Sequence, residues 1–413
     1  MIGDQRRVVQ LDIMATVVFD VRANHDTGVS RYGVSLLAVA APYVLDMGWR
    51  LIAVAQPWQE DHIRRAVAHL NVPVLACPDD RGFIRDSPWL RTQLRRQKAD
   101  LYYTAHYTVD RKCPVPFVYT IHDLTRLRYP ALSYGDADFA ERFGQHELDA
   151  ARRELAVLSG NGQSGAGPVF PRYFRALNHH LAERAQRIVT ISRSTAGDIK
   201  RLLGVSDARL DLVPGGVDGT VFRPRGSQEV RAVAARHGLD GPYVLYTGLV
   251  HPNKRVEWLL ERLVEARAAF PAGARLVVAG GHAEKSALVR DVVARGQAEG
   301  FVVFAGRVDD DELAALYTGA SAYVTAAVSE GFGLPMLEAR ACGTQVIGTD
   351  IPALRETLAG TAHFYRPGDA SRLVALVMDA LSGRLPLIPS RPLPFAWESS
   401  GSLLVRALER AMG

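Results

Sequence analysis

Short runs of β-branched and aromatic residues recur along this chain. In the first half they lie at 16–21, 51–55, 72–76, 100–104, 117–121, 188–192 and 210–214. In the second half they lie at 243–247, 275–280, 301–305, 322–326, 345–349 and 362–365. The runs are apolar at successive positions, which is typical of parallel strands buried on both faces. Helical patterns separate the runs, for example at 254–269, 284–298 and 309–319. This alternation of strands and helices predicts doubly wound α/β sheets.

A joint rich in Gly, Pro and charge at 214–242 separates two such sheets. The length of 413 residues fits two or three domains. We predict an N-terminal α/β domain over 1–225 and a second α/β domain over 226–390. The remaining segment, 391–413, contains a helix beginning near Glu398 that we expect to return to the N-terminal domain.

One region interrupts the alternation. Residues 136–158 are charged and helical in pattern, and 159–167 are rich in Gly and Ser, so 136–167 has the character of an insertion. Its apolar positions form a stripe that must cover another surface: Phe139, Phe143, Leu148, Leu155 and Leu158. The stripe could cover the N-terminal domain, a second subunit or a ligand, and a surface decoration with no role is the alternative.

Charge and cysteine content narrow the functional classes. The formal net charge of +5 suits an anionic ligand or a loose membrane contact, and no dense basic block marks a nucleic-acid partner. The three cysteines are few, far apart and odd in number. They argue against a disulfide scaffold or a zinc cluster and fit a reducing cytosol.

The N-terminal residues suggest no export. The first residues are polar, so we expect no signal peptide, and Met14 is an alternative start to Met1. The uncharged stretch between Arg31 and Asp46 is too short to span a bilayer. We therefore expect a cytoplasmic protein, with peripheral contact at the inner face of the membrane as an open alternative.

The most informative stretch is SEGFGLPMLEARACGTQVIGTD, residues 329–350. Seven residues separate Glu330 from Glu338, and a Gly-Phe-Gly turn follows Glu330. A Gly-rich turn into a helix that starts near Leu334 and Pro335 presents backbone N–H groups to a phosphate. Two carboxylates beside it can hold sugar hydroxyls. The alternative is a tight turn with a solvated carboxylate pair.

This stretch resembles the EX7E motif of the retaining GT-B glycosyltransferases of family 4. Segment 192–224 is similar to the interdomain segment of that family, and YTIHDLTRLRYP (119–130) to its "HDL" variant. The resemblance extends over nearly the whole chain from about residue 16. It implies two Rossmann-like domains that face each other across a cleft. The N-terminal domain (1–225) would bind the acceptor, the second domain (226–390) would bind a nucleoside-diphosphate sugar as co-substrate, and the helix in 391–413 would cross back to the N-terminal domain.

The resemblance also implies roles for the residues of the motif. Glu338 would bind the ribose hydroxyls of the nucleotide, and Glu330 the hydroxyls of the donor sugar. The backbone of Phe332, Gly333 and Leu334 would contact the sugar or the diphosphate.

Further donor contacts are implied outside the motif. Arg307 and Val308 lie where relatives cradle the nucleobase, and Lys254 where the family has its diphosphate lysine. Many relatives read Pro-Arg-Lys-Asn there, whereas this chain reads Pro-Asn-Lys-Arg at 252–255, so Arg255 is the candidate for a second charge. Independently, a fixed cation would stabilise the negative charge of a leaving diphosphate. The alternative for Lys254, a solvated lysine in a first helical turn, is disfavoured by the helix dipole.

The N-terminal half supplies the other candidates. His122 follows a predicted strand at its carboxyl end, where open α/β sheets bind ligands, and the matching histidine of relatives lies near the donor sugar. A capping or packing role is its alternative. Asp123 and Arg126 are candidates for acceptor binding, although Asp123 could equally cap a turn. The insertion 136–167 follows them closely, so we expect its base on the acceptor side of the cleft and expect it to shape acceptor choice. Gly28 resembles the glycine loop of the family near the β-phosphate, with Thr27 and Arg31 as neighbours.

The acidic run Asp309-Asp310-Asp311-Glu312 invites a metal-binding interpretation, which we reject. It precedes a helical pattern, and acidic residues at a helix N-terminus are satisfied by its N–H groups and dipole. We expect no metal and no further cofactor.

The combined hypothesis is a retaining glycosyltransferase with His122, Lys254 and Glu330 as catalytic residues. It would move a hexose or deoxyhexose, with mannose or rhamnose types favoured, to a hydroxyl of a glycan or glycolipid. A small-molecule acceptor, a GT-B phosphorylase or epimerase, and a non-catalytic nucleotide-sugar binder are the alternatives. The nucleobase, linkage and oligomeric state stay open.

Overall fold

The computed structural model describes most of the chain, and each structural statement below concerns these residues: 14–23, 28–78, 87–106, 109–160, 166–280, 289–298, 300–389 and 395–413.

The described N-terminal half contains a seven-stranded parallel sheet in the order β3-β2-β1-β4-β5-β6-β7. Its strands have these bounds: β1 Thr16–Asp20, β2 Arg50–Ala55, β3 Val74–Ala76, β4 Leu101–Thr104, β5 Phe117–Ile121, β6 Arg187–Thr190 and β7 Leu210–Leu212. Nearly every strand position is buried, because helices cover both faces. The helices are α1 Gly28–Asp46, α2 Glu60–Ala66, α3 Pro88–Arg96, α4 Thr125–Arg128, α5 Asp136–Phe143, α6 Gln145–Leu158, α7 Val169–Arg184 and α8 Arg193–Leu203.

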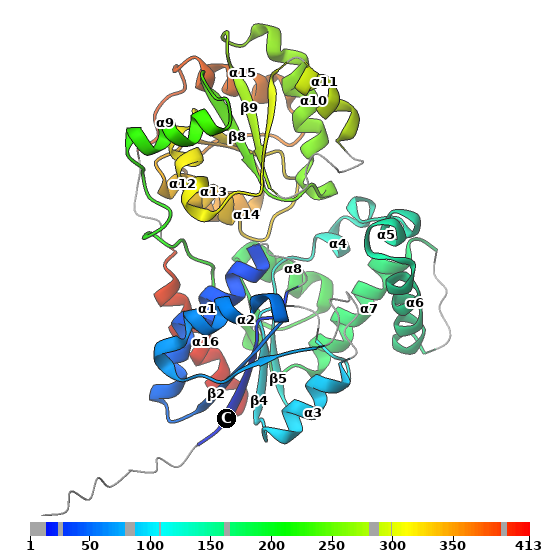
Figure 1. Cartoon of the computed structure of the whole chain (residues 1–413). Coiled ribbons are helices and arrows are strands. Elements are labelled where there is room, and N and C mark those ends of the chain that lie inside the picture. Colours follow the sequence, from blue (N-terminus) through cyan, green and yellow to red (C-terminus); the bar gives the residue numbers. More distant parts are fainter. Residues whose placement is uncertain are drawn as a thin grey trace, which may run out of the picture.

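The second sheet has six parallel strands in the described part of the chain, in the order β10-β9-β8-β11-β12-β13. The strands are β8 Tyr243–Thr247, β9 Arg275–Ala279, β10 Val302–Gly306, β11 Ala322–Val324, β12 Val346–Thr349 and β13 His363–Tyr365. The helices are α9 Ser227–Arg236, α10 Val256–Ala266, α11 Arg290–Ala298, α12 Asp310–Gly319, α13 Leu334–Ala341, α14 Pro352–Leu358, α15 Ala370–Leu381 and α16 Trp397–Met412. Figure 1 shows the two sheets in separate lobes.

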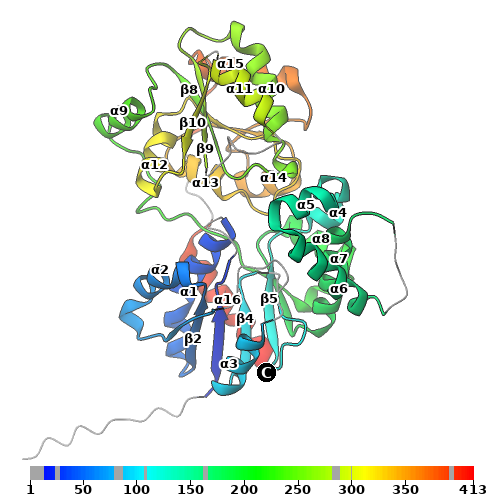
Figure 2. The same ribbon diagram turned by 45° about the vertical axis from the view of Figure 1, so that its right-hand side comes forward.

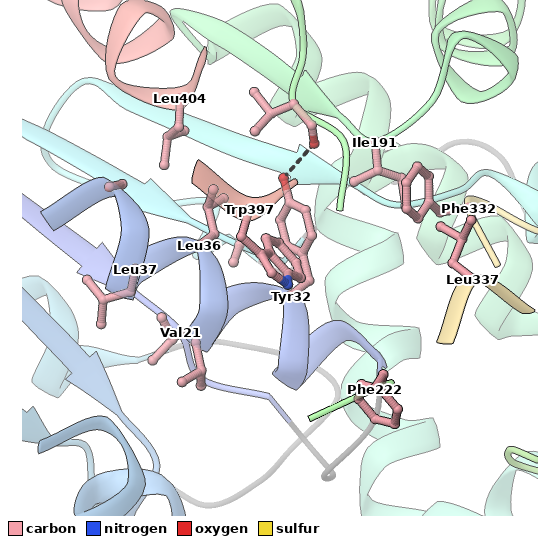
Figure 3. Packing of buried hydrophobic residues seen from close by; sticks show 14 of the residues in the cluster. Val21, Tyr32, Leu36, Leu37, Ile191, Phe222, Phe332, Leu337, Trp397 and Leu404 are labelled. Carbon is pink, nitrogen blue, oxygen red and sulfur yellow. Dashed lines mark hydrogen bonds between the residues drawn. The ribbon is translucent and has the colours of Figure 1, made fainter. Parts of the chain in front are cut away.

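Helix α16 returns from the second domain to the first, as the resemblance implies. It packs along α1 and against the strands of the first sheet (Figure 1). The two helices approach closely at Gly401, where a Cβ atom would lie 2.5 Å from the carbonyl oxygen of Val39. Figure 3 shows Tyr32 and Trp397 next to each other, with ring centroids 5.8 Å apart. Phe332 from the second domain belongs to the same buried cluster, so the core is continuous across the joint.

Helix α1 is longer than the sequence pattern suggests. It runs for 19 residues because Arg31 is accommodated in its first turn. Among the described helices it alone is long and apolar enough to cross a membrane by length and composition. This corrects the expectation that the stretch between Arg31 and Asp46 is too short to span a bilayer. Half of its apolar window is buried inside the structure, and α16 covers part of that face.

The insertion also differs from its expected form. Residues 136–158 form two helices rather than one segment, because the chain turns at Gly144 with φ of +97°. Figures 1 and 2 show α5 and α6 beside α7 at the edge of the N-terminal domain. Phe139, Leu148 and Leu155 are buried in the same cluster as α7, so the predicted stripe covers the N-terminal domain itself. Residues 161–165 of the predicted loop lie outside the described residues.

The strand orders create one topological switch point in each sheet. In the first sheet the chain order reverses between β1 and β4, and in the second between β8 and β11. Ligands of open α/β sheets bind beyond the carboxyl ends of the strands at such points. The doubly wound α/β architecture predicted from the sequence is confirmed, and each predicted run overlaps a strand.

Candidate functional site

A cavity of about 390 Å³ lies between the domains, and both switch points contribute to it. From the first sheet come Gly28, in the connection after β1, and His106, after β4. From the second come Thr247, at the end of β8, and Thr325, just after β11. The size falls within the range of small-molecule sites. The cavity is therefore where this fold is expected to bind a ligand.

The turn before α13 is shaped by its glycines. Gly331 lies so close to the other domain that a Cβ atom would be 2.2 Å from the backbone oxygen of His122. Gly333 has φ of +90° and is the N-cap residue of α13, with Pro335 in the first turn. The first N–H groups of a helix have no intrahelical partner, and they carry the positive end of the dipole. The turn thus presents an anion-binding end to the cavity.

Lys254 and Glu330 form an ion pair in the cavity wall. The Glu330 side chain is 8% exposed and that of Lys254 is 29% exposed. Asn253 fixes the lysine loop to the motif: its Nδ2 donates to the carbonyl oxygen of Ser329, and its own carbonyl accepts the Val328 N–H, both at 2.9 Å. The ion pair and the hydrogen bonds that fix the lysine loop therefore lie within one domain.

His122 follows β5 and lines the cavity from the N-terminal side. Its Nε2 lies 2.7 Å from the carbonyl oxygen of Ala105. A carbonyl only accepts, so Nε2–H donates and Nδ1 of the neutral ring is left as an acceptor. Burial lowers the pKa of His122, which favours this neutral form. The Tyr32 ring packs edge-on against the imidazole, with ring centroids 5.0 Å apart, and fixes its orientation.

The residues proposed for the acceptor lie next to His122. Asp123 accepts the Thr125 N–H at 2.9 Å, so its carboxylate caps the start of α4. The Thr125 hydroxyl lies 2.7 Å from that of Ser329 and links the two domains. Arg126 lines the cavity, and its guanidinium lies over the Phe170 ring, 4.8 Å from the centroid.

The segment just before the insertion meets the second domain near this wall. Tyr134, which precedes α5, packs edge-on against His251 with ring centroids 5.2 Å apart. His251 lies just before Lys254 and lines the cavity. Burial, with help from the nearby Arg126, lowers the pKa of His251 to about 4. The base of the insertion therefore lies beside the cavity, as expected, while its effect on acceptor choice stays a prediction.

Glu338 lies away from the cavity wall, on the buried side of α13. Arg31 of the other domain donates to it, with Nη1 3.1 Å from Oε1. The Tyr317 hydroxyl donates to Oε2 at 3.3 Å. Burial raises the pKa of Glu338, and the positive charge of Arg31 opposes that rise.

The acidic run at 309–312 behaves as a helix start. Asp309 is the N-cap of α12, and its side chain accepts the Glu312 N–H at 2.8 Å. Asp310 pairs with Arg31 and Asp311 with Arg225. Within the described ranges, no group of three or more His, Cys, Asp or Glu side chains is arranged to hold a metal ion.

Family models match both halves of the chain. The model described as "Glycosyltransferase Family 4" matches residues 36–221, and that described as "Glycosyl transferases group 1" matches residues 241–382. Together the matches cover most of the chain and both domains. This chain belongs to the group 1, family 4 glycosyltransferases.

Individual relatives of this family member are distant. An O-antigen chain mannosyltransferase B of Escherichia coli is 28% identical over 51% of this chain and 55% of that protein. A D-inositol 3-phosphate glycosyltransferase of Mycobacterium tuberculosis is 27% identical over 64% of this chain and 55% of that protein. The chain thus spans about half the length of the curated relatives it matches.

A solved structure establishes the fold type. HepE of Anabaena, crystallised with UDP and glucose, is 15% identical with a TM-score of 0.62, over 96% of this chain and 95% of that one. At this identity the likeness concerns the fold alone. The fold is GT-B, with two Rossmann-like domains and a C-terminal helix that crosses back.

The structure brings most of the predicted residues of this family member to one cavity. Those lining it come from both domains: Gly28, His122, Asp123, Arg126, Lys254, Glu330, Phe332, Gly333 and Leu334. Thr27 lies outside the described residues.

Four predicted donor residues lie outside the cavity lining in the described structure. Arg255 is exposed in a left-handed conformation, with φ of +51°, at the start of α10. Arg307 is exposed and Val308 half-buried, both following β10 at the carboxyl edge of the second sheet. Glu338 is the fourth. Their assigned roles stay predictions.

Two contacts between the domains were missed by sequence reasoning. The resemblance implies that Arg31 lies beside the glycine loop, near the β-phosphate of the donor. In the structure, its guanidinium contacts Glu338 and Asp310 instead. Glu356 of α14 accepts the N–H groups of Arg193 and Ser194 at the start of α8, at 2.8 and 3.0 Å. Nothing in the local sequence indicates that Arg31 is the partner of Glu338, nor does it indicate the partner of Glu356.

Proposed function

We propose that this protein is a retaining glycosyltransferase. It transfers a hexose or deoxyhexose from a nucleoside-diphosphate sugar to a hydroxyl of a glycan or glycolipid. The observation that carries this proposal is the Lys254–Glu330 pair in the cavity wall, next to the N-terminus of α13 and opposite His122. A cation, a dipole end and hydroxyl-binding groups meet there, as a diphosphate joined to a sugar requires.

The donor would rearrange the pair that it meets. A diphosphate competes with Glu330 for the Lys254 ammonium, because both are anions that the lysine can pair with. Once released, the Glu330 carboxylate can accept hydrogen bonds from the hydroxyls of the sugar. Nδ1 of neutral His122 offers a second acceptor on the opposite wall. Glu338 would hold the ribose.

The transfer itself is a front-face substitution. A bond forms between the acceptor oxygen and the anomeric carbon while the bond from that carbon to the diphosphate oxygen breaks. The acceptor proton moves to the departing diphosphate, and the configuration is retained. Lys254 and the N-terminus of α13 stabilise the negative charge on the leaving group. We assign no covalent nucleophile and no metal to this scheme.

The acceptor would approach along Asp123 and Arg126, from the side of the insertion. Mannose- and rhamnose-type sugars are favoured on the HDL sequence, and the name of the E. coli relative supports a mannosyl donor. The same name supports a glycan acceptor. We propose a cytoplasmic location, where nucleotide sugars are made.

The test is a turnover screen of UDP-, GDP-, ADP- and dTDP-sugars, first for slow donor hydrolysis and then for transfer to glycan and glycolipid acceptors. NMR of the product should show an unchanged anomeric configuration, and activity should persist in EDTA. Arg126→Ala should raise the acceptor KM and leave donor hydrolysis in place. An inverted product, or no turnover with any donor, would refute the proposal.

A further inference from the structure

Arg31 connects the two domains at the buried end of the motif. It lies in the first turn of α1, in the N-terminal domain. Its Nη1 donates to Glu338 of α13 at 3.1 Å and its Nη2 to Asp310 of α12 at 2.6 Å, both in the other domain. Its Cζ lies 5.1 Å from the centre of the Phe222 ring in the joint between the domains. One side chain thus engages three elements beyond its own helix.

The contact leaves Glu338 able to bind more donors. An ionised carboxylate has about four lone-pair sites on its two oxygens. Arg31 occupies one site on Oε1 and the Tyr317 hydroxyl one on Oε2. The remaining sites can accept from the two hydroxyls of a ribose. Arg31 therefore need not leave when a nucleotide arrives.

The charge of Arg31 also affects the ionisation of Glu338. The carboxylate is almost fully buried, which raises its pKa, and Asp310 of α12 raises it further. Arg31 and Tyr317 act in the opposite direction. Burial raises the pKa of Cys342, which follows α13, and that of Tyr323 of β11, and the negative charge of Glu338 adds to both rises. Arg31 also donates a hydrogen bond directly to the Glu338 carboxylate, so it acts through geometry as well as through charge.

We infer that Arg31 is a positioning residue of the nucleotide site, supplied by the opposite domain. It holds the Glu338 carboxylate in the orientation that a ribose requires. Binding of the nucleotide and docking of the two domains are therefore coupled through this ion pair. The inference rests on the proposed function, because it takes Glu338 as the ribose ligand.

The experiment measures nucleotide affinity against pH. UDP, GDP, ADP and dTDP are titrated by calorimetry into wild type, Arg31→Met and Arg31→Lys between about pH 5.5 and pH 8. We expect Arg31→Met to weaken the tightest-binding diphosphate by about tenfold near pH 8, as for loss of a charge-assisted contact. The loss should grow by a further threefold or more near pH 5.5, because Glu338 then protonates at a higher pH. Arg31→Lys should restore most of the wild-type pH profile.

Two controls separate positioning from general damage. Arg225→Met removes another ion pair to α12, with Asp311, and should leave the pH profile unchanged. Glu338→Gln should bind weakly at every pH, and adding Arg31→Met to it should weaken binding little further.

The outcomes are distinguishable. A loss in Arg31→Met that is equal at all pH values, or that adds fully to Glu338→Gln, would overturn the role of Arg31 while leaving the proposed function intact. Wild type that binds none of the four diphosphates would refute the proposed function and this inference with it.

Discussion

The two ends of the Glu330–Glu338 motif are built in different ways. At the first end, Glu330 lies in the cavity wall and pairs with Lys254 of its own domain. At the second end, Glu338 lies behind the wall and pairs with Arg31 of the other domain. Only seven residues separate the two carboxylates. Even so, the ion pair of Glu330 lies within one domain, whereas that of Glu338 forms between the domains.

This difference suggests that the two ends have different functions. A pair held within one domain keeps its geometry whether the cleft is open or closed, which suits groups that stabilise charge during the reaction. A pair that spans the cleft has its full strength only when the domains are docked. Such a contact can link ligand binding to closure, because a ligand shifts a conformational equilibrium by its differential affinity for the two states. Four predictions test this comparison.

The largest effect is expected at the first end. Lys254→Ala should lower kcat/KM by a factor of about 100 or more, the order found when one preorganised charge stabiliser is removed. Steady-state kinetics with the donor identified by the turnover screen provide the measurement. Lys200→Ala is the control, because Lys200 pairs with Asp207 at the surface and lies on α8. Activity within a few-fold of wild type in Lys254→Ala would remove this lysine from the site.

His251 lies just before Lys254, at the first end of the motif. We expect acid to lower the free energy of unfolding through protonation of this histidine. Burial lowers the pKa of His251 in the folded protein to about 4, from an ordinary value of 6.5. Protonation therefore favours the unfolded chain, and the stabilising contribution of the neutral ring is present above pH 6.5 and is lost as the pH falls towards 4. Between about pH 7.5 and pH 5, wild type should lose about 2 kcal/mol more free energy of unfolding than His251→Gln.

Chemical denaturation at the two pH values measures this difference. His69→Gln, at an exposed histidine, is the matched control and should lose as much as wild type. Equal losses in wild type and His251→Gln would mean that His251 is not held neutral by the fold.

The third prediction separates the two carboxylates directly. Glu338→Gln should weaken binding of a free nucleoside diphosphate by about tenfold or more, since it removes the charge that accepts the ribose hydroxyls. Glu330→Gln should leave that affinity within about twofold and instead impair binding or turnover of the complete donor. Calorimetry with the diphosphate alone compares them. Equal losses in both variants would show that the two ends do not divide the donor as proposed.

The two ends of the motif also differ in how much of them could be predicted from the sequence. The Lys254 loop and the Gly331–Gly333 turn are short, local patterns next to strands, and strand runs such as 243–247 are apolar over their whole length. The resemblance to the family, together with the Gly-rich turn, therefore located this end. The division of the insertion at Gly144 was not predicted, although a glycine inside a helical pattern can signal a break.

The contacts of the second end join residues far apart in the chain. Arg31 and Glu338 are separated by 307 positions, and Arg193 and Glu356 by 163. Such pairs arise from the way the two domains dock, which no local pattern encodes. The sequence contains 44 arginines and only five lysines. A single arginine therefore says little about a functional site. The placement of the family residues at one cavity could be expected, whereas the cation behind Glu338 could not.

The smallest effect concerns a contact remote from both carboxylates. Glu356 of α14 accepts two N–H groups at the start of α8 and thereby connects the domains. A carboxylate at a helix N-terminus contributes about 0.3–1 kcal/mol, so Glu356→Ala should shift the equilibrium towards undocked domains by about two- to fivefold. Small-angle scattering should show a larger radius of gyration in the variant. Arg355→Ala is the control, because Arg355 pairs with Asp350 inside its own domain, at 2.6 Å.

This shift should act on one end of the motif and spare the other. If Glu338 depends on docking through Arg31, Glu356→Ala should weaken diphosphate binding by about two- to fivefold in wild type. The same substitution should change little in an Arg31→Met background, where the link between docking and the ribose site is already broken. The Lys254–Glu330 pair lies within one domain, so donor contacts that depend on it should be unaffected. An equal effect of Glu356→Ala in both backgrounds would mean that docking reaches the nucleotide by a route other than Arg31, and the contrast between the two ends would lose its structural basis.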